Sequence, residues 1–188
     1  SSDNNVMIGN NSGGGTWAGG ESYNNVAVGH ETMQGALNSA INNTALGHYA
    51  LQELTTGDSN TVVGSLAGDD GTTMSGSTFL GKDAGGTVTT GNQNIAIGLD
   101  AMHGGTTTGD NNIAIGVSAG DAIVGAKGNI LMGKDAGGTL QAGNYNVAIG
   151  YEALYADDNT NNTNAVGYRS LYTQNTTSAY NNAFGPYT

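Results

Sequence analysis

The side chains of this chain that could do chemistry are few, and they do not form a catalytic set. Histidine is the most common acid–base residue and metal ligand, and the chain has three, His30, His48 and His103. No serine or carboxylate recurs in step with them to complete a triad. The glycine clusters precede no Gly-Lys-Ser/Thr sequence, so they do not form a phosphate-binding loop. We therefore expect that the chain is not an enzyme.

Two acidic pairs are the candidate metal ligands. Asp69-Asp70 and Asp157-Asp158 could chelate calcium, because hard cations prefer carboxylate oxygens. Neither pair has the spaced oxygens of an EF-hand or the nonapeptide of calcium-binding rolls. We favour solvated turns for both pairs and expect no cofactor, with calcium binding as the alternative.

Four tyrosines near the C-terminal end could serve in recognition. Tyr151 and Tyr168 are separated by 17 residues, as are Tyr155 and Tyr172. If that interval is a structural repeat, the four side chains form two short ladders on the outside of the molecule. Such ladders could contact glycans or another chain, and simple stacking between neighbouring coils is the alternative.

Four Asn-X-Ser/Thr sequons would accept N-glycans if the chain passes through a glycosylating pathway. The sequons begin at Asn10, Asn42, Asn161 and Asn175. Chance matches are also expected in a chain so rich in Asn and Thr, so these are candidate glycosylation sites.

A repeat that runs through the chain positions all these residues. A short apolar run closed by glycine recurs eleven times, at intervals of 17 or 18 residues after a first interval of 20. The closing glycines are Gly9, Gly29, Gly47, Gly64, Gly81, Gly98, Gly116, Gly133, Gly150, Gly167 and Gly185. A fixed short period is typical of one structural unit stacked on itself.

The repeated unit is too short for a helical repeat. Two helices and a turn need about 33 residues, and Gly and Asn are too frequent for helix interiors. The pattern predicts an all-β fold, a β-solenoid of the parallel β-roll or β-helix type with about 11 coils of 17–18 residues. Residues 1–188 would form a single rod-like repeat domain, part of a longer or polymeric fibre.

Each unit contains one predicted strand directly before the closing glycine. The residue three before it is β-branched in nine of eleven copies, and the residue one before it is apolar in every copy. Because alternate residues of a strand share a face, we expect these two to point into a thin core. The residue between them is alanine in seven copies. We expect it on the opposite, open face, where its small size would admit a neighbouring chain.

Asparagine recurs four residues before the closing glycine. Stacked coils would turn this column into an amide ladder of the kind found in cross-β stacking. The alternative is a turn residue that tolerates the left-handed conformation. The ladder candidates are Asn5, Asn25, Asn43, Asn60, Asn94, Asn112, Asn129 and Asn146.

Other polar residues also fall in step. Turns such as Gly57-Asp58 combine a glycine with an Asp or Asn that is expected to cap its own backbone. Glu152 and Arg169 share a repeat position and are expected to pair. His30 and His48 each follow a closing glycine, so we expect them to stack in adjacent coils.

Composition excludes two classes of partner. The net charge is −11, with only four Lys and Arg residues, whereas a nucleic-acid surface needs clustered basic residues. No run of about 18 apolar residues is present, so we expect no membrane span.

The strand segments have a recognisable resemblance. The strings Asn25–Gly29, Asn94–Gly98, Asn112–Gly116 and Asn146–Gly150 resemble the Ser-Val-Ala-Ile-Gly core of the head repeat in trimeric autotransporter adhesins. That family folds as a left-handed parallel β-roll, packs three chains around a common axis and binds host surfaces or matrix. The unit is also similar to repeats of phage and algal-virus tail-fibre-like proteins that precede a C-terminal chaperone domain. The resemblance implies an extracellular, cell-surface or virion location.

Three hypotheses for function follow. The leading one is a structural component of an extracellular fibre or filament that self-associates, either as a trimeric rod or head to tail. The alternative is a surface adhesin or phage receptor-binding rod whose outer Tyr and Asn rows recognise glycans. Ice binding is a third, but the threonine array that it requires is in step for only three coils, at Thr44, Thr61 and Thr78.

Overall fold

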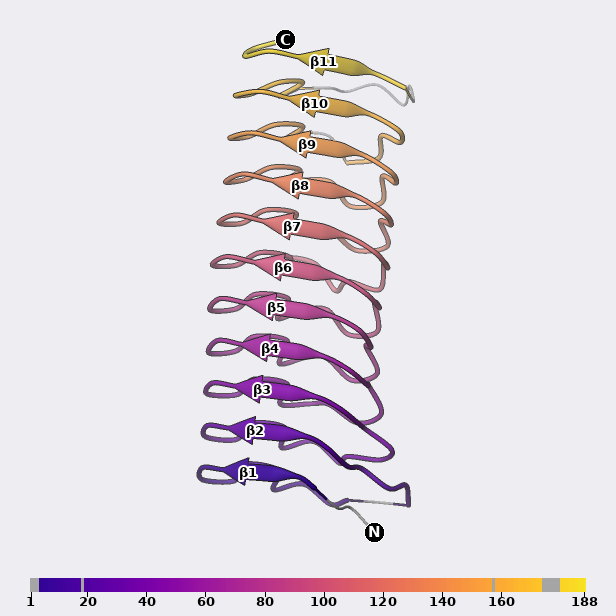
Figure 1. Ribbon diagram of the computed structural model, residues 1–188. Coiled ribbons are helices and arrows are strands. Elements are labelled where there is room, and N and C mark those ends of the chain that lie inside the picture. The colour runs from indigo at the N-terminus through magenta and orange to yellow at the C-terminus, as the bar shows by residue number, and fades with distance from the viewer. Residues whose placement is uncertain (1–3, 18, 157, 174–179) are drawn as a thin grey trace.

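The computed structural model describes residues 4–17, 19–156, 158–173 and 180–188. Within these residues the chain is all-β, without a helix, and eleven parallel strands form one sheet in the order β1 to β11 (Figure 1). The strands are β1 (Val6–Ile8), β2 (Val26–Val28), β3 (Thr44–Leu46), β4 (Thr61–Val63), β5 (Thr78–Leu80), β6 (Ile95–Ile97), β7 (Ile113–Ile115), β8 (Ile130–Met132), β9 (Val147–Ile149), β10 (Asn164–Val166) and β11 (Asn182–Phe184). The predicted β-solenoid is confirmed.

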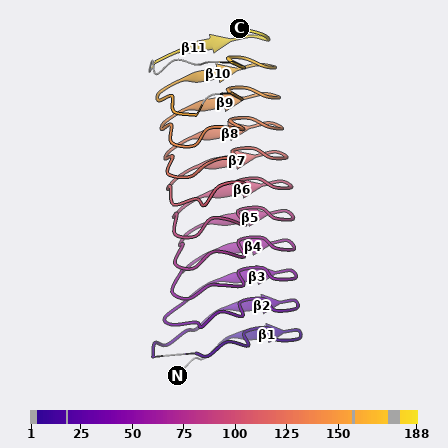
Figure 2. The same cartoon turned by 180° about the vertical axis from the view of Figure 1, so that it is seen from behind.

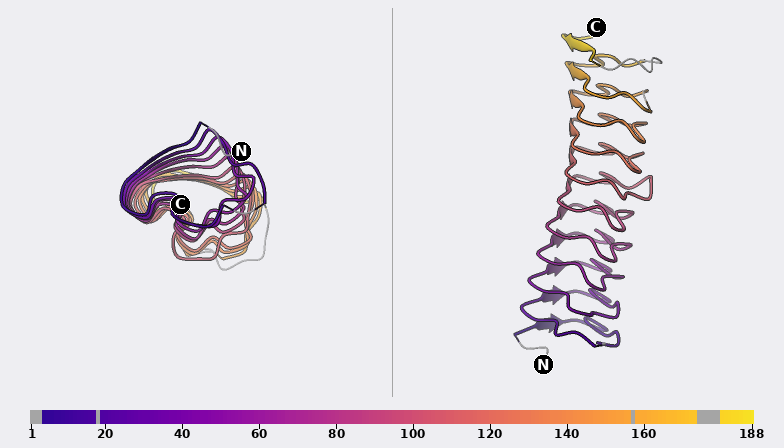
Figure 3. Two further views of the ribbon diagram at one scale, coloured as in Figure 1. Left: turned by 90° about the horizontal axis from the view of Figure 1, so that it is seen from below. Right: turned by 90° about the vertical axis from the view of Figure 1, so that its right-hand side faces the viewer.

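The coils stack into a rod whose two chain ends lie at opposite ends (Figures 1 and 2). Viewed along the rod, the coils nearly superimpose, and each is turned slightly relative to the one before it (Figure 3). Strands in a sheet are spaced by about 4.8 Å, so eleven of them make a rod on the order of 50 Å long.

The repeat places neighbouring strands in register. Each strand begins three residues before a closing glycine, so Ala96 of β6 lies beside Ala114 of β7 and Ile97 lies beside Ile115. The hydrogen bonding continues past the strands, because the closing glycine of one coil donates to the strand of the coil before it, as Gly98 does to the carbonyl of Leu80 (2.9 Å). One repeat of the sequence therefore forms one coil of the structure.

Glycine closes each strand because the backbone turns there and the next coil approaches closely. Gly64 has a φ of 148°, and a Cβ at this position would lie 2.0 Å from the carbonyl oxygen of Gly81. The same approach to the next closing glycine recurs in every coil from Gly9 to Gly167. A side chain here would both strain φ and push two coils apart.

The strand faces are the reverse of the prediction. The central residue of every strand from β2 to β10 points into the coil and is fully buried. The first and third residues lie outside: Ile8 is 58% exposed, Leu46 47% and Leu80 48%. The expectation of an open alanine face and an inward β-branched face was therefore wrong.

Alanine lies inside because large side chains enter the core from the turn after the closing glycine. In five coils a central Ala is combined with Leu or Met four residues after the glycine, as Ala148 is with Leu154. In four others a large central residue is combined with Gly there, as Phe79 is with Gly85. A Cβ on Gly85 would lie 2.6 Å from the Phe79 ring. Each of these coils fills its narrow core from one side or the other, which keeps packing dense.

Candidate interaction surface

The asparagines four residues before the closing glycines bond from coil to coil inside the rod. The Oδ1 of Asn25 accepts hydrogen bonds from the backbone N–H of Asn43 (3.0 Å) and from the Asn43 side chain (3.1 Å). The Asn43 side chain also donates to the carbonyl oxygen of Gly57 (2.8 Å). The two bonded runs are Asn5, Asn25, Asn43 and Asn60, and Asn94, Asn112, Asn129 and Asn146. Seven of these eight amides are fully buried, so this asparagine ladder holds the stack together and does not face a partner.

Ser77 interrupts the asparagine ladder between its two runs. Its N–H donates to the Oδ1 of Asn60 (3.0 Å), and its Oγ accepts from the N–H of Asn94 (3.2 Å). Serine thus keeps the bonds to the backbone of the next coil. It has no amide nitrogen to make the two further bonds that each asparagine side chain can donate.

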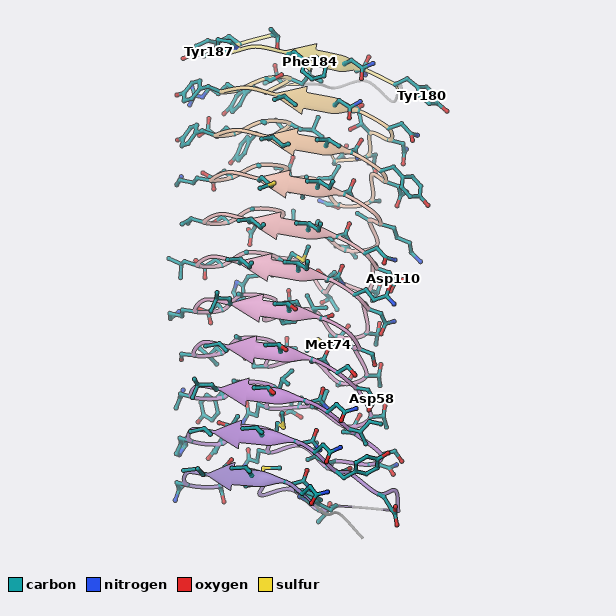
Figure 4. All side chains as sticks on the ribbon, in the orientation of Figure 1. Asp58, Met74, Asp110, Tyr180, Phe184 and Tyr187 are labelled. Atoms are coloured by element: carbon teal, nitrogen blue, oxygen red, sulfur yellow. The ribbon has the colours of Figure 1, made fainter. Side chains whose placement is uncertain are left out.

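A second ladder runs through the turns that precede the strands. The Oδ1 of Asp58 accepts from the N–H of Ile41 (2.7 Å), and the Oγ of Ser75 accepts from the N–H of Asp58 (3.0 Å). Asn92 and Asp110 continue the series, each accepting from the N–H one coil earlier (both 2.9 Å). Figure 4 shows Asp58 and Asp110 on the same side of the rod.

The prediction that such residues cap their own backbone was therefore wrong for Asp58, because its carboxylate caps the coil before it. The signal for this turn ladder was a shared position six residues before the closing glycine. Its members are Asp58, Ser75, Asn92, Asp110, Asn144 and Asn161. In the asparagine ladder a backbone N–H donates to the side chain of the coil before it, and in the turn ladder it donates to the side chain of the coil after it. A coil that takes part in both ladders is therefore bonded to both of its neighbours.

Among the carboxyl groups with shifted pKa values, Asp110 and Asp69 shift in opposite directions. The hydrogen bond from the Asn92 N–H and the ammonium group of Lys127, 3.1 Å away, lower the pKa of Asp110. Burial, together with the neighbouring Asp70, raises the pKa of Asp69 to about 6. The first carboxylate therefore stabilises the folded chain when ionised, and the second destabilises it.

The histidines and the predicted ion pair lie on separate coils. His30 and His48 stack, with ring centroids 5.2 Å apart and ring planes 16° from parallel. His103 does not join them, and it lies near the carboxylates of Asp69 and Asp121. Arg169 and Glu152 form the expected salt bridge.

The candidate calcium ligands do not come together. Asp69 is half-buried and Asp70 exposed on one coil, and Asp158 is exposed five coils further on. Asp157 lies outside the described residues. Across the described part of the chain, no three His, Asp or Glu side chains are placed to hold a metal ion.

The four tyrosines form the two ladders that their spacing predicts. Tyr151 and Tyr168 stack with centroids 5.2 Å apart, and Tyr155 and Tyr172 stack at 5.3 Å, both within 8° of parallel. The Arg169 guanidinium lies 5.5 Å from the Tyr168 ring centroid and 5.1 Å from that of Tyr172.

The ring faces of the first tyrosine ladder are occupied. Tyr151 and Tyr168 cover each other, the Lys134 ammonium group lies 5.3 Å from the other side of the ladder at Tyr151, and Tyr187 meets Tyr168 edge-on. A sugar that stacks on an aromatic residue needs an open ring face. The contacts of this ladder are therefore those of stacking within the rod.

The sequons differ in how available their asparagines are. Asn10 and Asn42 are exposed, and the Oδ1 of Asn42 accepts a bond from Asn24 (3.2 Å). Asn161 is a member of the turn ladder, where its Oδ1 accepts from the N–H of Asn144 (2.8 Å). A glycan on Asn161 would disturb that bond. Asn175 lies outside the described residues.

The outward residues of the strands form one continuous surface, which we call the strand face. It consists of the first and third residues of β1 to β11, every one of which is exposed or partly exposed. None of these residues is charged, and apart from three threonines and two asparagines all are aliphatic or aromatic. Sequence reasoning missed this surface because it assigned these residues to the core.

Comparison of the chain with protein-family models, with curated proteins and with solved structures found no match. No helix long and apolar enough to cross a membrane occurs in the described residues.

Proposed function

We propose that the chain is a structural rod of an extracellular fibre or filament, at a cell surface or on a virion, that assembles with further copies of itself. The observation that carries this proposal is the unbroken stack. Eleven strands in register extend one fold along one axis, without a linker in the described residues. Stacked repeats contact only their neighbours, so such a fold lengthens by adding units and suits a spacer.

The hydrogen bonding between coils is a second argument for a structural role, because it resists bending and shear. Each junction from β1 to β10 combines backbone hydrogen bonds along the strands with side-chain bonds of the asparagine ladder or the turn ladder, as at Asn25, Asn43 and Asp58. Bending or shearing the rod at one coil would break several of these bonds together, and each buried group left unpaired costs about 1–3 kcal/mol. The extracellular placement rests on the resemblance of the repeat to adhesin heads and tail-fibre-like proteins.

Sedimentation velocity of the whole chain tests the proposal. We expect particles that are elongated and heavier than the 18.8 kDa of one chain, with the proportion of heavier particles rising with concentration. A compact particle of 18.8 kDa at every concentration would contradict both the rod and its assembly.

Glycan recognition has less support from the geometry. The four tyrosines on which it depended stack in two pairs, Tyr151 on Tyr168 and Tyr155 on Tyr172, and the buried asparagines are not accessible. We therefore do not assign the rod a sugar site.

A further inference from the structure

The strand face carries no charge, although the chain as a whole is strongly acidic. The protein has a net charge of −11, yet no charged residue occurs among the outward positions of the eleven strands. Large side chains remain uncovered along the face: Val6 is 46% exposed, Leu80 48% and Ile149 38%. The largest apolar patch on a typical soluble monomer covers about 300–600 Å² and is often functional, so an apolar face of this extent is a candidate interaction site.

The chemistry of the face indicates a second copy of this chain as its occupant. Two molecules that each carry a charge of −11 repel one another, so an uncharged surface is where they can approach with the least electrostatic cost. The strand face is such a surface over the whole length of the rod. A partner must also present apolar side chains over the same length and at the same spacing of about 4.8 Å. An identical rod meets both conditions at every coil, whereas a globular partner would cover only part of the face.

The area of the face reaches the lower limit for a specific pair. Eleven strands at about 4.8 Å, each three residues or about 10 Å wide, give roughly 500 Å² on each copy. Two such faces bury about 1,000 Å², which is at the lower limit for a specific interface. The residues directly after the closing glycines flank this surface and are mixed: Leu99 and Val117 are 44% and 39% exposed and enlarge the apolar area at two coils, whereas Lys82 and Lys134 occupy the same position at two others.

The width of the face favours two copies over three. Sheets that pack face to face lie about 10 Å apart, so each lies about 5 Å from the plane of contact. Three sheets at that distance from a central axis would each need to be roughly 17 Å wide to enclose it. A strand of three residues covers about 10 Å, which is enough for two flat faces in contact but leaves gaps around a three-fold axis.

We infer that two copies of the chain pack strand face against strand face, so that the assembling unit of the proposed fibre is a pair of rods. This inference rests on the proposed function and adds to it the surface, the partner and the number of chains. The contact is apolar and joins two acidic molecules, so salt should strengthen it by screening the repulsion between them.

Light scattering coupled to size exclusion tests the inference on the whole chain. For the wild type we expect twice the mass of one chain, 18.8 kDa. The double variant L46K/L80K places two like charges on the face of each copy, at side chains already almost half exposed, and should elute with the mass of one chain. Val124→Lys is the matched control, because Val124 is 41% exposed and lies outside the strand face. This control should keep the wild-type mass.

The outcomes separate the inference from the proposal beneath it. Circular dichroism equal to that of the wild type establishes that the double variant is folded. If it is folded and remains paired, the strand face is not the contact, and the proposed fibre stands with another surface. A wild-type mass of three chains contradicts the pair but not self-association. A wild type with the mass of one chain at every concentration and at high salt overturns the pairing and the assembly together.

Discussion

The closing glycines are the residues on which the stack depends most. Gly64 combines a φ of 148° with a carbonyl oxygen of the next coil 2.0 Å from where a Cβ would lie. Gly64→Ala should therefore lower the free energy of unfolding by about 2–5 kcal/mol, from left-handed strain and overpacking together. Gly125→Ala is the control, because a Cβ there meets no atom within 4 Å. Urea unfolding of both variants measures the difference, and equal losses would contradict this account of the repeat.

The half-buried carboxyl group of Asp69 makes stability depend on pH. Its folded-state pKa is about 6, above the ordinary value of 3.8, so the folded chain retains a proton that the unfolded chain releases. Stability therefore falls as the pH rises from about 4 to about 6 and stays lower above that range.

Asp69→Asn removes this titration. Relative to the wild type, the free energy of unfolding of the variant should rise by about 1–2 kcal/mol between pH 4 and pH 8. This is less than the full pKa shift would give, because solvent screens a carboxyl group that is only half-buried. Asp158→Asn removes an exposed carboxyl group and serves as the control. Urea titrations at the two pH values give the comparison. A gain for Asp69→Asn that is the same at both would show that this carboxyl group is not the cause.

At the scale of the element, the asparagine ladder can be completed by a substitution at Ser77, where it is interrupted. Ser77→Asn restores the amide group that the equivalent Asn43 uses for two bonds, and it should raise the unfolding free energy by about 1 kcal/mol. The reverse change within an intact run, Asn112→Ser, should lower it by more, because buried partners lose their bonds. Thermal unfolding of the two variants checks both signs. A loss on Ser77→Asn would mean that the site has no room for the amide.

Because the large core residue of a coil comes either from the strand or from the turn, a loss of volume at one position should be compensated by a gain at the other. Leu131→Ala empties one core position and should cost about 2–5 kcal/mol. Adding Gly137→Leu recreates the combination of Ala148 with Leu154 in the next coil and should recover much of that loss. Gly137→Leu alone should be destabilising, because a Cβ there lies 2.8 Å from Leu131. Additive losses in the double variant would contradict the proposed complementarity.

The positions of the strands could be predicted from the sequence, but which of their residues face the core could not. Every strand begins where the glycine period places it, because only glycine fits the closing position, as at Gly64. The inward face was misjudged because large β-branched residues are normally core residues and alanine is ambiguous. What decides the matter is volume: Leu154 enters from the turn and leaves space only for Ala148 opposite. The sequence contains both columns, but it does not reveal that they share one core.

The same limit applies to the candidate site. The asparagine and tyrosine columns were found because residues in step must stack, as at Asn43 and Tyr168. The turn ladder was missed because an Asp such as Asp58 can cap its own backbone or the coil before it, and local sequence does not distinguish the two. The strand face followed from neither column. It became visible only once the core was known to lie on the alanine side.

At the scale of the whole molecule, the chain is a rod with a buried ladder of polar side chains and one uncharged, mostly apolar face. The two properties are linked, because the small central residues that allow a narrow coil leave the larger strand residues outside. The rod supplies length, and its strand face is the surface through which we propose that two copies associate. The proposed assembly rests on geometry that repeats along the rod.

The most direct test of this rod is a set of spin-label distances in solution. The chain has no cysteine, so paired cysteine variants can be labelled without background. Thr56, Thr108 and Ala142 share one exposed position eight residues before a closing glycine, in coils three and then two apart. With labelled chains diluted in unlabelled ones, the separation should be about 14 Å for T56C/T108C and about 24 Å for T56C/A142C, or about 4.8 Å per coil. Separations that do not increase with the number of intervening coils would contradict the stack and the function argued from it.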